Sequence, residues 1–317
     1  MRRPLLGGLC ALLAGCSSGS AALQSPSANG ASAAGRVHAT FTQRYSGTPL
    51  LYASDSANQV VWIVQQAGKK QKAIGSITGF SAPKGLAVDS AGNLYVGDVT
   101  GDGGHIYVFA PGGTTPFRTL TGVETPYSIA VDANGNVYSN CIQNPGCTEN
   151  AVYVFAPGST TPTTTLVDPN FGQILYVAVD AAGDVFLDGD TTSFPVSANE
   201  IDEIPAGTTA PVIVNANVNN PYYMILDGAQ NLIVAAADGG YINIFAPPYT
   251  GKPQKKKLET QCDANALTLN AGDSALWYDC GTQAFQLTYP GLKKVEATAP
   301  LTQWSLDGLA ADPASSL

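Results

Sequence analysis

Residues 106–120 read IYVFAPGGTTPFRTL and residues 152–166 read VYVFAPGSTTPTTTL, identical at 11 of 15 positions. The duplicated stretch is a strand, a turn and a second strand. A second motif repeats around it, and we name its strand a. Its copies are GLAVD (85–89), SIAVD (128–132), YVAVD (176–180), YMILD (223–227), ALTLN (266–270) and GLAAD (308–312). Their spacing of 42 to 48 residues, with four short strands a to d per period, predicts the blades of a β-propeller.

The two ends of the repeat complement each other. The last strand a, near residues 305–312, has no strands b, c and d after it. Residues 50–55, 59–66 and 71–78 read as strands b, c and d with no strand a before them. Joining the ends completes a sixth blade and leaves no large exposed sheet edge. We therefore expect an all-β fold, a six-bladed propeller of four-stranded antiparallel blades over residues 49–317.

Two segments of the repeat resemble a known family. PKGLAVDSAGNLYVGD (83–98) and PYSIAVDANGNVYSN (126–140) resemble the NHL repeat and, more loosely, the propellers of the gluconolactonase group. The resemblance covers about residues 49–317. NHL repeats commonly carry Arg near the start of strand c, where this chain has His105, Ala151, Glu200, Tyr241 and Ala284. The family's function is therefore not carried over residue by residue.

Composition narrows the class of partner. Charged residues make up 12% of the chain, and the formal net charge of −9 argues against nucleic acid, which calls for a basic surface. Short runs of Val, Ile, Tyr, Phe and Leu are bounded by Gly, Asn, Asp and Pro, as in all-β proteins.

The N-terminus carries the features of an export signal. Arg2 and Arg3 precede a short apolar run at residues 5–14, which is too short to span a bilayer. Residues 13–16, Leu-Ala-Gly-Cys, resemble the bacterial lipobox, which implies a signal peptide over residues 1–15 and lipidation of Cys16. The alternative is an ordinary secretory signal with a chance Cys.

These features predict a location in the bacterial cell envelope. Ser17 after the Cys favours the outer membrane, where the cell has one. Residues 16–48 are expected to be a lipid-anchored flexible tether, because they are rich in Ser, Ala and Gly. Val37 to Tyr45 has some strand character that the repeat does not place.

Strand direction sorts the connections onto two faces. The d–a and b–c loops share one face, which we call the top, and the a–b and c–d turns share the bottom. Both predicted disulfides, Cys141–Cys147 and Cys262–Cys280, fall on the top face, and export permits oxidation. A four-Cys zinc site is the alternative, although the two pairs belong to blades three and six.

Nine lysines form an arc on the bottom outer rim, at the c–d turns of blades five, six and one. They are Lys69, Lys70, Lys72, Lys252, Lys255, Lys256, Lys257, Lys293 and Lys294. The arc would face anionic headgroups or other anionic envelope material. The alternative, which we favour, is protection of the outermost strands against pairing with other chains.

One repeat position lies at the top mouth of the central channel. It holds Lys84, Tyr127, Leu175, Tyr222, Asn265 and Asp307, with Tyr176 and Tyr223 beside it. This mixed, aromatic mouth is the predicted binding site for a sugar, a peptide or a protein loop. The alternative is that the tyrosines pack between blades. Long b–c loops at residues 97–104, 140–150 and 188–199 also lie on the top face.

An enzyme is the less favoured interpretation. A calcium-dependent lactonase would need converging carboxylates and Asn at the mouth, where only Asn265 and Asp307 occupy the matched position. The acids of the b–c loops, Asp98, Asp102, Asp188 and Asp190, could also hold calcium, but they are expected to be solvated. DANGN (132–136) recurs in other blades and is expected to be an a–b turn.

Within the predicted propeller, residues 49–317, motifs for nucleophilic, zinc or nucleotide chemistry (G-x-S-x-G, HExxH, the P-loop and G-x-G-x-x-G) do not occur. His38 and His105 have no evident Cys or Ser partner. We therefore expect a lipid-anchored binding or scaffold module without a cofactor, acting on a protein, peptide or glycan. The alternative is a gluconolactonase-type hydrolase with calcium.

Overall fold

The computed structural model describes residues 37–41, 49–66, 73–99, 103–142, 147–190, 199–215, 218, 220–236, 240–258, 264–270, 272–280, 283–300 and 306–311. The chain divides into two compact units, Met1–Ala31 and Ser32–Leu317, and every described residue belongs to the second. The predicted signal peptide, Cys16, Lys69, Lys70, Lys72 and Cys262 lie outside the described residues. The described residues include no helix long and apolar enough to span a membrane.

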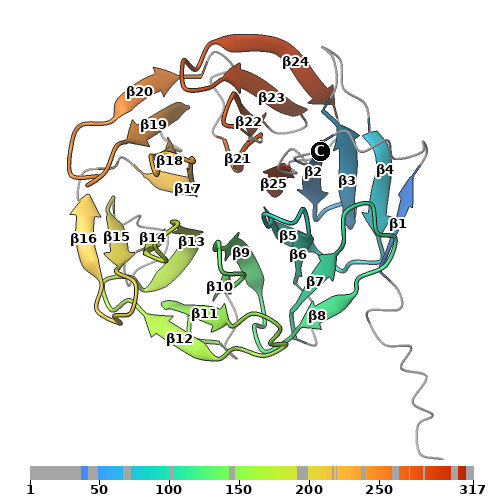
Figure 1. The fold of residues 1–317 in the computed structure, drawn as a ribbon, viewed down its shortest axis with the longest axis horizontal. Helices are drawn as coiled ribbons and strands as arrows, with labels where there is room; N and C mark the ends of the chain where they lie inside the picture. The colour runs from blue at the N-terminus through green and yellow to red at the C-terminus, as the bar shows by residue number, and fades with distance from the viewer. Residues whose placement is uncertain are drawn as a thin grey trace, which may run out of the picture. The chain divides into compact units, whose positions relative to one another are not determined.

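The second unit is a ring of six antiparallel sheets around a central channel (Figure 1). Strands are given from the channel outward. Blade one contains β25 (Gly308–Ala311), β2 (Leu50–Asp55), β3 (Val60–Gln65), β4 (Ala73–Thr78) and β1 (His38–Phe41). Blade two contains β5 (Pro83–Val88), β6 (Leu94–Asp98), β7 (His105–Phe109) and β8 (Arg118–Leu120). Blade three contains β9 (Pro126–Val131), β10 (Val137–Cys141), β11 (Ala151–Phe155) and β12 (Thr164–Val167).

The remaining three blades repeat the same order. Blade four contains β13 (Gln173–Val179), β14 (Val185–Asp190), β15 (Ile201–Ile204) and β16 (Val212–Asn215). Blade five contains β17 (Pro221–Leu226), β18 (Leu232–Ala236), β19 (Tyr241–Phe245) and β20 (Gln254–Lys257). Blade six contains β21 (Leu267–Leu269), β22 (Ala275–Cys280), β23 (Gln283–Thr288) and β24 (Lys294–Pro300).

The ring closes as the repeat predicts. The strand β25, near the C-terminus, pairs antiparallel with β2, which places Leu309 opposite Ala53 and Ala311 opposite Leu51. The side chains of Leu306 and Leu309 are buried. The six-bladed, all-β prediction is therefore confirmed, including the joining of the two ends of the chain in one blade.

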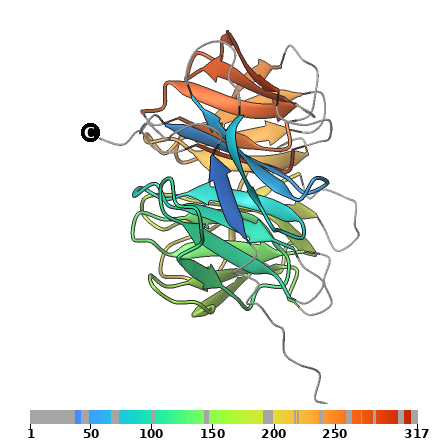
Figure 2. The ribbon, with the colours of Figure 1, turned by 90° about the vertical axis from the view of Figure 1, so that its right-hand side faces the viewer.

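The strand β1 adds a fifth strand to blade one and lies within residues 16–48, the range expected to be a tether. It pairs antiparallel with β4, with His38 opposite Thr78. The Ala39 amide also donates to the Thr114 carbonyl in the c–d turn of blade two, at 2.7 Å. Figure 2 shows this side of the ring, with β1 facing the viewer. The segment thus covers the outer edge of blade one and ties it to blade two.

The a–b turns have the predicted structure. In blade three, Asp132 Oδ1 accepts the backbone amides of Asn134 and Asn136, and its Oδ2 accepts the Asn136 side-chain amide. Gly135 has a φ of 83°, which glycine adopts without strain. The carboxylate therefore caps the turn, and DANGN is confirmed as a turn motif.

Burial follows the position of each strand in its blade. Every residue of β6, β10, β14 and β18 is buried, because these second strands lie between neighbouring blades. The outermost strands β16 and β20 contain no buried residue. The core is thus a set of interblade layers that hold the inner strands, and the site at their ends, in fixed positions.

Candidate functional site

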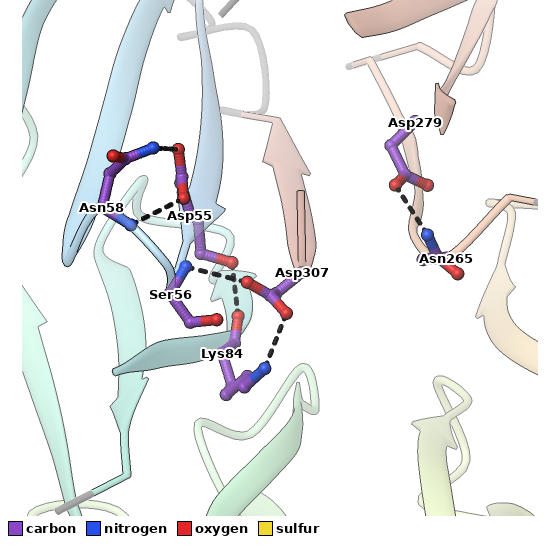
Figure 3. A network of polar contacts seen from close by, with 8 residues as sticks. Asp55, Ser56, Asn58, Lys84, Asn265, Asp279 and Asp307 are labelled. Atoms are coloured by element: carbon purple, nitrogen blue, oxygen red, sulfur yellow. Dashed lines mark hydrogen bonds and ion pairs between the residues drawn. The ribbon is translucent and has the colours of Figure 1, made fainter. Parts of the chain in front are cut away.

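Residues from blades one and two meet at the top mouth of the channel. Lys84 Nζ lies 2.7 Å from Asp307 Oδ1, and both side chains are partly exposed. Asp307 Oδ2 also accepts the Ser56 amide at 2.8 Å (Figure 3). Because Lys84 belongs to β5 and Asp307 directly precedes β25, the ion pair joins adjacent blades.

Four tyrosines fill the centre of this end of the channel. The Tyr176 ring contacts the rings of Tyr127, Tyr222 and Tyr223, with centroids 5.8, 5.3 and 5.0 Å apart. Tyr176 and Tyr223 are buried, whereas Tyr127 and Tyr222 are partly exposed. Tyr176 and Tyr223 therefore pack in the interior, as the alternative interpretation expected. Tyr127 and Tyr222 lie at the surface of the mouth.

The ion pair and the tyrosines form one connected group, which we call the mouth cluster: Lys84, Tyr127, Tyr222 and Asp307. Lys84 Nζ lies 5.7 Å from the centroid of the Tyr127 ring, in the range of a cation–π contact. Burial raises the pKa of Tyr127 to about 12, with a smaller contribution from Tyr222. The Tyr127 phenol is therefore neutral at physiological pH and suited to hydrogen bonding and ring stacking.

Asn265, the other predicted residue of the mouth, has a different partner. Its side-chain amide donates to Asp279 Oδ2 at 3.3 Å, and Asp279 Oδ1 accepts the Ala266 amide. Burial, opposed by these hydrogen bonds, raises the pKa of Asp279 to about 7. Figure 3 shows Asn265 with Asp279 in one group, and Lys84 with Asp307 in another. Asn265 and Asp307, the two residues that the hydrolase interpretation needs as calcium ligands, each contact another side chain instead of each other.

The expectation that the b–c loop acids are solvated is wrong for three of them. Asp98, Asp188 and Asp190 are buried, because they lie in the second strands β6 and β14 between blades. Asp98 Oδ1 accepts the backbone amides of Ser81 and Ala82 at 2.9 and 2.8 Å. Asp102 lies outside the described residues. Among the described residues, no group of three or more His, Cys, Asp or Glu is arranged to hold a metal ion.

A disulfide supports one top loop. Cys141 and Cys147 are bonded, with their Cα atoms 6.2 Å apart, which confirms the predicted pairing. The Thr125 hydroxyl contacts both Cys141 Sγ and the Ile142 carbonyl, so the d–a loop and the b–c loop of blade three are held together. Cys280 is also disulfide-bonded. Its predicted partner Cys262 is outside the described residues, so that pairing stays a prediction.

The channel encloses a cavity that the sequence interpretation did not identify as a site. Its volume is about 560 Å³, and its walls come from the inner strands of all six blades. Ala87, Ala130, Ala178 and Ala310 line it, as expected for small residues near the axis. Asp89, Asp180, Asp227 and Asp273 also line it, at the a–b turns. Three of these acids, Asp89, Asp180 and Asp227, are the recurring Asp at the end of strand a, which was the sequence signal for them.

Some of the described lysines of the bottom rim lie on an outermost strand. Lys255, Lys256 and Lys257 belong to β20, which pairs with β19 on one side only. Lys252, Lys255, Lys257 and Lys293 are exposed. Lys294 belongs to β24, but its side chain is outside the described set. Attraction to anionic surfaces stays a prediction.

Comparisons with known proteins place the chain by its fold. No protein-family model matches the sequence, and no curated protein matches it. A chain of the nidogen/laminin complex is similar with a TM-score of 0.67 and 15% identity, over 84% of this chain and 99% of that chain. Hydrazine synthase of Kuenenia stuttgartiensis is similar with a TM-score of 0.54 and 15% identity, over 75% of this chain and 73% of that chain. Streptogramin B lyase is similar with a TM-score of 0.48 and 15% identity, over 65% of each chain.

At 15% identity these similarities show the fold alone. Together with the strand order, they define the chain as a β-propeller protein of six blades.

Proposed function

We propose that this chain is a bacterial envelope lipoprotein with an NHL-like propeller, which binds a protein, peptide or glycan through its top face. The N-terminal signal features and Cys16 support the anchor, and the strand repeat supports the NHL likeness. The hydrolase alternative has weaker support, because Asp307 is already paired with Lys84 and with the Ser56 amide.

The mouth cluster is the observation that carries this proposal. Tyr127 and Tyr222 offer partly exposed ring surface, and the Lys84–Asp307 pair offers hydrogen-bond donors and acceptors beside it. Aromatic faces next to polar groups suit sugar rings and peptide side chains. The buried ring of Tyr176 packs against both of these partly exposed rings, so little ordering is needed on binding.

Affinity capture from native envelope extracts tests the proposal. We expect the unaltered chain to capture an envelope component saturably. The double variant Tyr127→Ala/Tyr222→Ala should capture about tenfold less of it, because it loses two central aromatic anchors. Phe117→Ala is the matched control, since Phe117 is 60% exposed and lies in a c–d turn on the bottom face. It should change capture less than about twofold.

Asp307→Asn gives a second readout with a smaller change in packing. It weakens the ion pair with Lys84 while keeping the size of the side chain. Equal capture by the unaltered chain, the double variant and Asp307→Asn would refute the mouth cluster as the binding surface, provided that the melting curves show all three folded.

The anchor has its own test. Cys16→Ser should abolish incorporation of a clickable palmitate analogue and release the chain from the membrane fraction, because acyl chains supply the membrane affinity. Mock labelling of the unaltered chain controls for nonspecific labelling. Unchanged labelling of the Cys16→Ser chain would leave the lipoprotein assignment without support while leaving the mouth cluster untouched.

A further inference from the structure

Two fully buried carboxyl groups face each other between blades three and four. Asp168 follows β12 in a d–a loop of the top face, and Asp202 is the second residue of β15 in the next blade. Neither side chain is exposed to solvent. Asp168 Oδ2 and Asp202 Oδ1 are buried without a hydrogen-bond partner.

The other two carboxylate oxygens are held by one residue. The Asn170 backbone amide donates to Asp168 Oδ1 at 2.9 Å, and its side-chain amide donates to Asp202 Oδ2 at 2.6 Å. Both carboxyl groups are therefore fixed in orientation, each with one oxygen left over. Asn170 is exposed and Glu200 is partly exposed, so the pair lies beneath a surface that solvent reaches.

The surroundings are uncompensated negative charge. Residues 119–251 contain no Lys, Arg or His and 13 of the 24 acidic residues of the chain. Burial raises the pKa of Asp168 to about 7. The charges of Asp202 and Glu200 add to this, and the carboxyl groups of Asp168 and Asp202 are close enough to share a proton in a hydrogen bond. In the described part of the chain, the salt bridge that is observed, Lys84–Asp307, lies in other blades. Two buried carboxylates without a counter-ion are unfavourable unless they share a proton or bind a cation.

We propose that calcium binds between blades three and four, on Asp168 Oδ2 and Asp202 Oδ1. Calcium prefers carboxylate oxygens and tolerates irregular geometry, with water completing its shell. Glu200 adds a nearby negative charge at the entrance.

Such an ion would crosslink the ring at its surface. Asp168 and Asp202 belong to successive blades, so binding joins a d–a loop to the neighbouring sheet. The long b–c loop of blade four ends directly before Glu200. The ion would therefore stabilise the top face beside the predicted binding loops, at a place distinct from the channel mouth.

Isothermal titration of calcium chloride into the chelator-treated full chain at pH 7.5 tests the inference. We expect one saturable site in the unaltered chain and an affinity at least about tenfold weaker in Asp202→Asn, because a charged ligand is lost. Glu203→Gln is the matched control: it removes the same charge from the next residue of β15, whose side chain points to the opposite face of the strand. Its affinity should stay within about twofold.

Two further readouts separate the ion from a shared proton. Calcium affinity should fall by about tenfold or more from pH 8 to pH 5.5, because protons compete for the same oxygens. Without calcium, Asp202→Asn should melt higher than the unaltered chain, because the repulsion between the carboxylates is removed. Should Asp202→Asn fail to fold, Asp168→Asn reports on the same site.

The inference is overturned if the unaltered chain shows no saturable calcium binding. It is also overturned if Asp168→Asn and Asp202→Asn bind calcium as tightly as the unaltered chain. Loss of binding in Asp307→Asn but not in Asp202→Asn would move the ion to the channel mouth and contradict the interblade site.

Discussion

Replacement of Asp188 by Asn should raise the free energy of unfolding at pH 7.5 by about 1–3 kcal/mol, the usual effect of relieving an unsatisfied buried polar group. Asp188 lies within β14 of blade four, two residues before its end, and its carboxylate is completely buried. Neither of its oxygens has a hydrogen bond of normal geometry. Burial, with a contribution from the charge of Asp190, raises the pKa of Asp188 well above its ordinary value.

The neighbouring blade shows why Asn fits this position. Asn140 occupies the equivalent place in β10, since Ser139 is opposite Ile129 and Leu187 is opposite Val177. Its amide nitrogen donates to the carbonyls of Ile174 and Leu175 at 2.8 and 2.7 Å, and its oxygen accepts the Ser128 amide. An amide in place of Asp188 should find the corresponding groups of blade five.

The effect should depend on pH with a definite sign. A raised pKa means that folded Asp188 holds its proton where the unfolded chain has lost it. Stability associated with this group is thus full below its unfolded pKa, near 4, and is lost as pH rises through the folded value. Asn does not titrate, so the advantage of the variant should vanish near pH 4 and grow toward pH 8.

Chemical denaturation at pH 4, 6 and 8 measures this difference directly. The unaltered chain should itself become less stable over this range, because burial also raises the pKa values of Asp168 and Asp279 to about 7. Those two groups remain in the variant, so the difference between the chains isolates Asp188. Two results would contradict the raised pKa of Asp188. One is a variant less stable than the unaltered chain at pH 8, and the other is a gain in stability of the same size at all three pH values.

Removal of the closing strand should have the largest effect on stability. A chain that ends at residue 305 loses β25 and exposes the edge of β2. Burial of Leu306 and Leu309 contributes about 1.5–3 kcal/mol each, and the lost strand pairing adds to this. The sum approaches the whole stability of a typical domain, about 5–15 kcal/mol, so the truncated chain should unfold or aggregate at 25 °C.

The matched control ends at residue 311, just after β25. It keeps Leu306, Leu309 and the pairing with β2. Its denaturant midpoint should be about nine-tenths or more of the midpoint of the full chain, a difference within the usual error of extrapolation. Equal stability of the two truncated chains would show that β25 does not close the ring.

The ring was predictable because its signal is repeated. Each strand a ends in the same short motif, and the copy at residues 308–312 complements the missing strand of blade one. The turn at Asp132 was predictable for a similar reason, since an Asp followed by Asn and Gly has few local alternatives. The strand β1 could not be placed from the sequence, because its four residues belong to no repeat. They are held only by tertiary contacts, with β4 and with Thr114.

The mouth was predicted only in part. Repeat alignment brought Lys84, Tyr127 and Asp307 to the same end of the channel, and the structure joins them. Repeat alignment left open whether Tyr176 and Tyr223 line the mouth or pack between blades, and the structure buries both. Each lies one position after the mouth position of its strand, and successive side chains of a strand point to opposite faces.

The pair of Asp168 and Asp202 was also missed. The two residues are 34 positions apart and come from different elements, a d–a loop and the third strand of the next blade. Alignment of repeats compares equivalent positions and therefore does not bring these two together. Their contact depends on how one blade packs on the next, which requires the structure.

Every assignment of a residue to the top face, the channel or a neighbouring blade depends on ring closure. In the closed ring, the Asp307 amide donates to the Ser54 carbonyl at 2.9 Å and the Ala311 amide donates to Thr268 Oγ1 at 3.0 Å. Hydrogen exchange of a peptide covering residues 306–311 tests this most directly. We predict protection comparable to that of β6 in the core; exchange at the rate of a free C-terminal tail would contradict the closed six-bladed ring.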